Sequence, residues 1–273
     1  MADAAAEAKE KYGTQAVVGF TYRRVPAIQL ARRLVKEGRL GQIHHVRAQY
    51  LQDWLVDPQA PMSWRLEKDK AGSGALGDIG AHIIDLTQFI TGQDITSVSG
   101  ALRTFVSERP LPAEFSGLTG KAGEGTAQVT VDDTAAFLAD FSGGALGVFE
   151  ATRFATGRKN AIRIEINGSD GSLAFDFEDM NVLHYFDGRE DPVIAGFRRI
   201  LVTDPSHEYA SEWWPAGHVL GYEHAFSHQV VDLVRGIAER KTVHPTFADG
   251  LQVQKVLAAV EQSALHEKDW TRV

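Results

Sequence analysis

Regular alternation of apolar and polar residues is the feature that most restricts the fold of this chain. Residues 135–141 place alanine or phenylalanine at every second position, and residues 162–166 do the same with isoleucine. A period of two is typical of strands that bury one face. The Ser-Gly-Gly sequence at 142–144 favours a tight hairpin turn after the first of these segments. The middle of the chain is therefore predicted to form neighbouring antiparallel strands.

Helical patterns lie mainly towards the two ends of the chain. Pro26 and Gly38 bound one predicted helix, and residues 222–239 and 247–266 form two more. Further strands are predicted over 43–54, 95–106 and 171–186, whereas the Gly- and Pro-rich stretch 110–125 is predicted to be an exposed loop. This order favours an α+β fold, with a large, mainly antiparallel open sheet and helices on one face.

The first 20 residues form a separate unit in this prediction. Residues 2–12 are strong helix formers, and residues 15–20 form a short apolar segment typical of a buried strand. A helix and strand in this order are typical of the end of an α/β unit. A parallel strand needs neighbours, and none precede it here. We therefore separate a remnant at residues 1–20 from an α+β domain at residues 21–273.

The composition excludes several classes of protein. The 273 residues carry a net charge of -8, which argues against a nucleic-acid-binding surface. The chain contains no cysteine, so disulfides, thiolate nucleophiles and cysteine-ligated zinc are excluded. No apolar run approaches the roughly 20 residues that a membrane helix needs, and the N-terminus does not resemble a targeting peptide. We expect a cytoplasmic protein.

A glycine-rich segment leads into the helix that carries the most reactive side chains. Residues 71–77 contain three glycines, and Asp78 and His82 follow four residues apart. This spacing predicts a carboxylate and an imidazole on one helical face, one turn apart. A histidine can accept a proton near neutral pH, and a carboxylate can orient it or bind a substrate hydroxyl. The alternative is that the glycines are a flexible lead-in and that His82 only packs against the core.

A metal site is a weaker interpretation of the same residues. Asp78, His82 and Asp85 offer nitrogen and oxygen ligands, and His224 and His228 form a second pair four residues apart. The His-Glu-x-x-His motif of many zinc enzymes does not occur. We therefore predict no metal.

Aromatic and hydrogen-bonding residues together suit a sugar or polyol, whose C–H faces stack on rings while its hydroxyls need polar partners. The residues of this kind are Tyr50, Gln52, Asp53, Trp54, Trp64, Arg65, Trp213 and Trp214. For the tryptophans, the alternative is packing in a core or interface. No Gly-x-Ser-x-Gly motif, phosphate-binding loop or Gly-x-Gly-x-x-Gly fingerprint occurs.

Taken in order, these segments resemble the C-terminal half of the Gfo/Idh/MocA oxidoreductases, a family that includes inositol and NAD(P)-dependent sugar dehydrogenases. The resemblance covers essentially the whole chain. The segments that carry it are residues 17–27, 37–41, 64–65, 72–86, 223–235 and 245–250. The glycine-rich lead followed by Asp-x-x-x-His is the most specific of them.

The resemblance implies a mechanism. His82 would be the general base on a secondary hydroxyl of a sugar or cyclic polyol, and Asp78 would bind that substrate. The adjacent carbon would pass a hydride to C4 of the nicotinamide of NAD or NADP. The sequence adds Tyr22, Arg23, Trp64 and Arg65 as candidate substrate-binding residues.

The departure from the family pattern concerns the cofactor. The glycine-rich dinucleotide fingerprint and the Glu-Lys-Pro motif are expected before Met1, so no residue is assigned to cofactor binding. Residues 1–20 then match the last helix and strand of a Rossmann domain, and the chain is expected to be inactive alone. The alternative is a non-catalytic sugar-binding or dimerisation module. In both cases the open sheet favours a homo-oligomer.

Overall fold

The computed structural model describes residues 1–116 and 119–273. Its helices lie at both ends of the chain and around one central segment. The α-helices are α1 (Ala2–Tyr12), α2 (Pro26–Lys36), α3 (Lys68–Ala71), α4 (Ala81–Thr91), α5 (Tyr222–Glu239) and α6 (Phe247–Leu265). Short 3-10 turns are η1 (Thr21–Arg24), η2 (Trp64–Leu66), η4 (Phe177–Asp179) and η5 (Ala210–Glu212), and η3 (Leu76–Gly80) is a π-helical turn.

A nine-stranded sheet forms the body of the protein, in the order β10-β9-β8-β7-β1-β6-β5-β2-β11. Every pairing within it is antiparallel except that of β1 with β6. Its strands are β1 (Ile43–Leu51), β2 (Ile95–Arg103), β5 (Thr134–Phe141), β6 (Leu146–Thr152), β7 (Ala161–Gly168), β8 (Gly171–Asp176), β9 (Val182–Asp187), β10 (Arg198–Leu201) and β11 (Thr271–Arg272). The large sheet with helices agrees with the predicted architecture.

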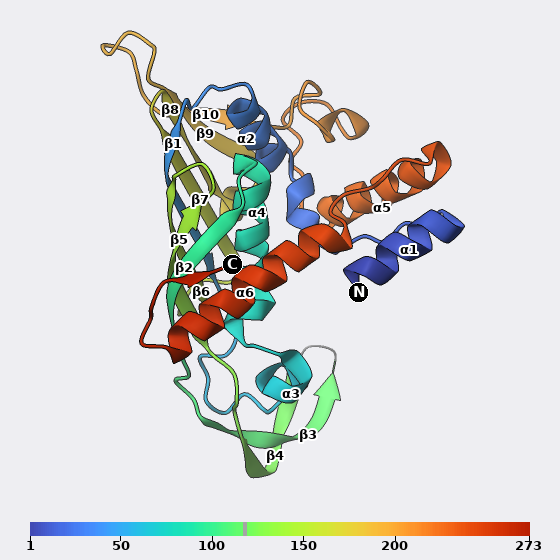
Figure 1. Cartoon of the computed structure of the whole chain (residues 1–273), viewed down its shortest axis with the longest axis vertical. Helices are drawn as coiled ribbons and strands as arrows, with labels where there is room; N and C mark the ends of the chain where they lie inside the picture. Colours follow the sequence, from blue (N-terminus) through green and yellow to red (C-terminus); the bar gives the residue numbers. More distant parts are fainter. Residues whose placement is uncertain (117–118) are drawn as a thin grey trace.

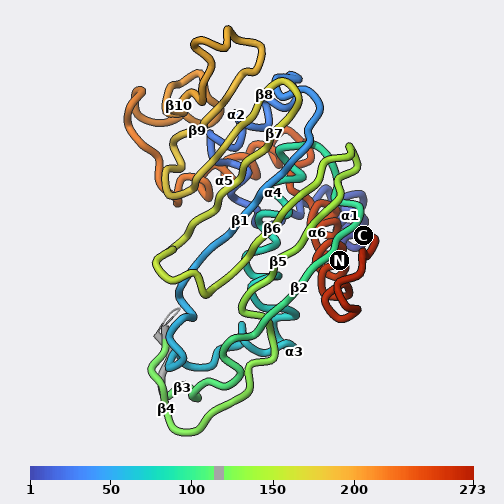
Figure 2. Tube along the Cα trace, turned by 90° about the vertical axis from the view of Figure 1, so that its left-hand side faces the viewer, coloured from blue at the N-terminus to red at the C-terminus, as the bar shows by residue number. Residues whose placement is uncertain are grey.

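One face of this sheet is covered by helices and the other is bare. Figure 1 shows the sheet edge-on, with α2, α4 and α6 packed on the same side of it. Figure 2 looks onto the opposite face, where the strands lie in front of the helices. The predicted alternation explains the layering, since Phe137 and Phe141 point into the core while Leu138 is 40% exposed.

Local sequence signals set the ends of the helices beside the site. Pro26 occupies the first turn of α2, where its missing N–H costs nothing. Gly92 ends α4 with φ of 68°, a left-handed conformation that suits glycine. Thr246 and Asp249 cap the start of α6 reciprocally through side-chain and backbone contacts. The predicted helices over 26–38, 222–239 and 247–266 are confirmed.

Two segments differ from the prediction. Residues 110–116 and 119–125 are not in a loop, because they lie in the paired strands β3 (Glu108–Ser116) and β4 (Thr119–Gln128), which project from one end of the molecule in Figure 1. The other two residues of the predicted loop, 117 and 118, lie outside the described residues. Its Gly and Pro residues hide the strand pattern, and the pairing contains register shifts near Pro112. Residues 15–20 form one antiparallel bridge, from Val17 to Thr246, and no strand. A strand needs a continuous partner, and the described residues offer this segment a single one.

In the part of the chain that the structure describes, no helix combines the length and the apolar character needed to span a membrane.

Candidate active site

The segment that carries Asp78 and His82 is a π-helical turn, η3, running into α4. Such turns occur frequently at functional sites. The Asp132 carboxylate fixes its start, accepting hydrogen bonds from the backbone N–H of Gly74 at 2.7 Å and of Leu76 at 2.8 Å. A Cβ on Gly74 would lie 1.8 Å from the Asp132 carbonyl oxygen. Glycine at this position therefore serves a close approach to Asp132.

His82 lies in an aromatic cage. Its ring centroid is 5.1 Å from that of Tyr22, 5.8 Å from Phe20 and 6.1 Å from Tyr50. Its Nδ1 atom is buried without a hydrogen-bond partner among the described residues. Burial lowers the pKa of His82 to about 4, although the Asp78 charge acts in the opposite direction. The imidazole is therefore neutral at pH 7 and able to accept a proton.

A row of hydrogen-bonded side chains runs outward from this cage. The hydroxyls of Tyr22 and Tyr50 are 2.7 Å apart, and Tyr50 Oη is also 2.7 Å from Asn160 Oδ1. Gln52 Nε2 donates to the same Asn160 oxygen at 2.8 Å, and Trp54 Nε1 donates to Gln52 Oε1 at 3.0 Å. Burial raises the pKa of Tyr22 to about 12 and also raises that of Tyr50, so both phenols stay protonated at neutral pH.

Asp78 faces a buried arginine at the other side of the cage. Its Oδ2 lies 3.5 Å from Nη1 of Arg153, whose side chain is 0% exposed, whereas 35% of the Asp78 side chain is exposed. The Arg153 guanidinium lies 5.6 Å from the ring of Trp54. The Asp78 carboxylate is therefore open to a ligand on one side and supported by a cation on the other.

Trp64 and Arg65 lie beside Asp78. The Arg65 guanidinium stacks over the Trp64 ring at 4.5 Å. Both residues line a cavity of about 400 Å³ together with Asp78, the backbone turn at Gly72, and Leu257 and Glu261 of α6. The structure thus places Tyr22 against His82, and Trp64 and Arg65 in a cavity shared with Asp78.

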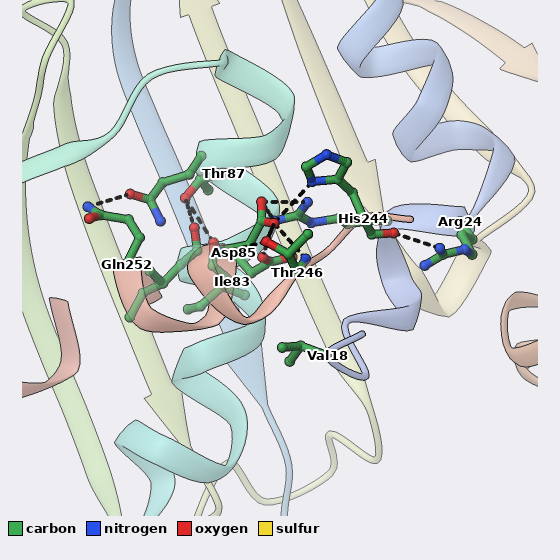
Figure 3. A network of polar contacts seen from close by, with 12 residues as sticks. Val18, Arg24, Ile83, Asp85, Thr87, His244, Thr246 and Gln252 are labelled. Atoms are coloured by element: carbon green, nitrogen blue, oxygen red, sulfur yellow. Dashed lines mark hydrogen bonds and ion pairs between the residues drawn. The ribbon is translucent and has the colours of Figure 1, made fainter. Parts of the chain in front are cut away.

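Arg23 follows a different course from Tyr22, its neighbour in η1. Its guanidinium binds Asp85 at 2.5 and 2.8 Å and approaches Asp249 at 3.3 Å. Figure 3 shows this region, with Asp85 of α4 beside Thr246 and His244 at the start of α6. Most donors of Arg23 are occupied within the protein, which argues against the substrate contact that the sequence predicts.

Two of the histidines considered as metal ligands, His224 and His228, have other partners. His224 Nδ1 accepts a hydrogen bond from the backbone N–H of Gly221, and His228 lies between the Arg24 carbonyl and the Trp213 indole. Within residues 1–116 and 119–273, no group of three or more His, Asp or Glu side chains is arranged to hold a metal ion.

Sequence reasoning missed Asp132, Arg153 and Asn160. They lie 54 to 82 residues from Asp78, so local spacing cannot connect them. Arg153 does leave a signal. It continues the buried alternation of Gly147, Phe149 and Ala151, and a charged residue at a buried position of a strand calls for a partner.

This chain is similar to known proteins over most of its length. The model of the GFO/IDH/MocA C-terminal domain matches residues 28–174. Levoglucosan dehydrogenase of Pseudarthrobacter phenanthrenivorans is 40% identical over 261 residues, which cover 94% of this chain and 66% of that protein. The chain thus spans about two thirds of the length of the curated relatives it matches.

Solved structures share the fold closely. An oxidoreductase domain protein from Kribbella flavida is 69% identical, with a TM-score of 0.94, and the match covers 100% of this chain and 70% of that one. A levoglucosan dehydrogenase in complex with NADH and L-sorbose is 37% identical, with a TM-score of 0.89, covering 98% of this chain and 68% of that one. The family model and these neighbours show that the chain belongs to the Gfo/Idh/MocA family.

Proposed function

We propose that this chain is the substrate side of an NAD(P)-dependent oxidoreductase that acts on a secondary hydroxyl of a sugar or cyclic polyol. The observation that carries the proposal is the neutral imidazole of His82, held in an aromatic cage next to the partly exposed Asp78 carboxylate. Two proteins similar to this chain support the sugar class. One is named levoglucosan dehydrogenase, and the other is a levoglucosan dehydrogenase solved in complex with NADH and L-sorbose.

The site residues divide the chemistry between them. His82 takes the proton of the reacting hydroxyl, since its pKa of about 4 leaves it unprotonated at neutral pH. Asp78 accepts a hydrogen bond from that hydroxyl or its neighbour and so orients the sugar. The half-exposed rings of Trp54 and Trp64 offer stacking faces for C–H groups. Holding the hydroxyl against His82 in this way supplies the orientation that the reaction needs.

The residues present fit the reacting end of a nicotinamide nucleotide. The cage of Phe20, Tyr22 and Tyr50 gives an apolar wall beside a proton acceptor, which suits hydride transfer away from water. When bound, the nucleotide would accept the hydride from the carbon that bears the hydroxyl. In the described residues, neither strand of the parallel pair, β1 or β6, is followed by a glycine-rich turn and helix that would hold a pyrophosphate.

We also propose that a nucleotide-binding domain packs against α1 and α5 and that residues 1–20 are its last segment. Two features support this arrangement. Helix α1 buries none of its residues. Helix α5 exposes Tyr222, Phe226, Val230 and Val234, which recur every four residues and form one apolar stripe. An exposed stripe of this kind is typical of a surface that another domain covers.

The bare face of the sheet is our proposed site of homo-oligomerisation. Leu138, Leu146 and Val148 are partly exposed there, on the adjacent strands β5 and β6. Sedimentation velocity tests this point. A dimer or larger species is expected, and replacing Val148 by Glu should shift it towards the monomer, whereas a monomeric wild type would contradict it.

Calorimetric titration with levoglucosan and with L-sorbose tests the proposed function. We expect saturable binding of at least one sugar, weakened about tenfold in Asp78→Asn because a charge-assisted hydrogen bond is lost. Asp140→Asn is the matched control, since Asp140 lies on the exposed side of β5 and bonds Ser97. Equal binding by Asp78→Asn and wild type would remove Asp78 from the site, and no binding of either sugar would count against the sugar class.

The second candidate is a sugar-binding module without catalysis. The lack of a pyrophosphate-binding turn in the described part of the chain favours it. Titration with NADH and NADPH, followed by nucleotide fluorescence, separates the two. Saturable nucleotide binding by this chain would show a dinucleotide site within it. If neither nucleotide binds, turnover depends on the proposed nucleotide-binding domain. The sugar titration then tests the sugar site, which both candidate functions share.

A further inference from the structure

Arg153 is a fully buried cation whose hydrogen-bonding capacity is only partly used. It follows β6 directly, and its side chain is 0% exposed. Nη2 donates to the Asp132 carbonyl at 2.9 Å, while Nη1 lies 3.5 Å from Asp78 Oδ2. Nε is buried without a hydrogen-bond partner among the described residues. Removing an arginine from water costs several kcal/mol, so a role for its charge is required.

The same arginine is linked to the start and to the middle of the η3 segment. The Asp132 carbonyl that accepts from Arg153 also accepts from the backbone N–H of Ala75 at 3.0 Å. The Asp132 carboxylate binds Gly74 and Leu76, as described above. A Cβ on Gly74 would lie 2.7 Å from Arg153 Nη2. The start of the turn is thus fastened to Asp132, and Asp78, four residues after Gly74, faces the other arm of the guanidinium.

We propose that Arg153 is a positioning residue for Asp78. It fixes the carboxylate relative to the turn that carries it and partly neutralises the charge that Asp78 presents to His82. Arg153 itself needs no contact with the sugar. This inference rests on the proposed function only for its consequence in catalysis, because the link between Arg153, Asp78 and His82 is a property of the protein without substrate.

The groups around His82 make the link measurable. Tyr22 of η1, Tyr50 of β1 and Asp78 of η3 surround the imidazole, and Tyr222 of α5 lies against Tyr22. Burial raises the pKa of Tyr22 and of Tyr50, so both of these phenols are neutral at neutral pH. Asp78 is the charged group that acts on His82. Any effect of Arg153 transmitted through Asp78 changes the midpoint of the His82 titration.

The experiment is an NMR titration of the His82 ring in the free chain, followed between pH 8 and the acid limit of folding. In Arg153→Gln we expect the His82 pKa to rise by about one unit, because the Asp78 charge is no longer neutralised. Arg153→Lys keeps the charge and should restore most of the wild-type value. Arg163→Gln is the control, since Arg163 lies on the bare face of the sheet, where it pairs with Asp176.

The double variant Asp78→Asn/Arg153→Gln shows whether the effect of Arg153 on the His82 pKa passes through Asp78. If Arg153 acts through Asp78, the rise seen in Arg153→Gln disappears in the double variant. A His82 pKa that is unchanged in Arg153→Gln, or a rise that persists without Asp78, overturns the proposal. If Arg153→Gln does not fold, two other variants test the link between Arg153, Asp78 and His82. The link is supported if the midpoint of the His82 titration is that of the wild type in Arg153→Lys and lower in Asp78→Asn. A lowered midpoint in Arg153→Gln or Arg153→Lys contradicts it. No sugar enters this titration, so it can succeed or fail independently of the sugar-binding test.

Discussion

Two carboxylate–arginine pairs lie one on each side of His82 along the same helical segment, and they differ in every physical respect. Asp85 and Arg23 form a fork at 2.5 and 2.8 Å, with the Asp85 side chain 1% exposed. Asp78 and Arg153 are 3.5 Å apart, and the Asp78 side chain is open to solvent on one side. The first pair is closed and the second is open.

Both pairs consist of an aspartate and an arginine, so residue type does not distinguish the structural pair from the pair at the candidate site. The two pairs differ in how far their buried polar atoms have hydrogen-bond partners. Asp249 completes the partners of Arg23, so that pair has little left to offer a ligand. Around the open pair, His82 Nδ1 and Arg153 Nε are both buried without partners in the described structure. Unsatisfied buried groups are costly, so their presence beside a partly exposed carboxylate calls for an explanation.

The largest expected effect separates the open site from the rest of the chain. In a protein that joins this chain to a nucleotide-binding domain, His82→Gln should lower kcat by about 10²–10⁴-fold, which is the usual contribution of a general base. His184→Gln is the matched control, because His184 is exposed on β9. Steady-state rates with NAD⁺ and a sugar give the comparison. Turnover near the wild-type rate in His82→Gln would exclude the proposed base.

Breaking the closed pair should affect stability instead. Asp85→Asn leaves a buried guanidinium with one weaker partner, Asp249, and should lower the free energy of unfolding by about 3–5 kcal/mol. Urea denaturation measures this loss. A change below about 1 kcal/mol would mean that the pair is not the closed structural unit that its geometry indicates.

The burial of His82, between the two pairs, also predicts a pH dependence of stability. His82 has a pKa of about 4 in the folded chain and an ordinary value of 6.5, so between these limits the unfolded chain binds a proton that the folded chain does not. Stability from this group therefore falls as the pH drops through that window, by about 3 kcal/mol in total.

Comparing unfolding curves of wild type and His82→Gln between pH 7 and 4.5 isolates the contribution of the histidine to stability. The other titrating groups, Asp85 among them, are present in both proteins. The free energy of unfolding of the wild type, measured relative to that of His82→Gln, should fall only on acidification. Parallel pH curves for the two proteins would show that His82 is not kept neutral by the fold.

The smallest effect on stability is expected from removing the ion pair between Asp78 and Arg153. Asp78→Asn should change the free energy of unfolding by less than about 1 kcal/mol, because its ion pair is long and partly solvated. Thermal melts of Asp78→Asn and Asp85→Asn side by side sharpen the contrast. A loss in Asp78→Asn as large as that in Asp85→Asn would place both pairs in the same structural class.

Much of the fold could be predicted because its signals are local. The alternation over 135–141 and 162–166 and the stop at Gly92 each depend on a few neighbouring residues. The sequence predicts a loop in place of β3 and β4 because Pro and Gly interrupt their strand pattern. The parallel pairing of β1 with β6 joins segments about 100 residues apart, and no local pattern specifies it.

The candidate site was predictable to the same extent. Asp78 and His82 are one turn apart and could be recognised together. The sequence offers Arg23 and Tyr22 alike as candidate substrate-binding residues, yet a 3-10 turn points successive side chains in different directions. Arg153 and Asn160 reach the site only through the sheet, so their place depends on tertiary packing that the sequence does not display.

The row of side chains beside His82 has a fixed direction. The indole of Trp54 can only donate, so it holds Gln52 with its oxygen towards the indole and its amide nitrogen towards Asn160. Asn160 must then present its oxygen, which makes Tyr50 a donor to it and leaves Tyr22 as the donor to Tyr50. The Tyr22 oxygen, having spent its only proton, can only accept. One tryptophan, 32 residues away in the sequence, thus determines that the Tyr22 hydroxyl beside His82 is an acceptor of hydrogen bonds.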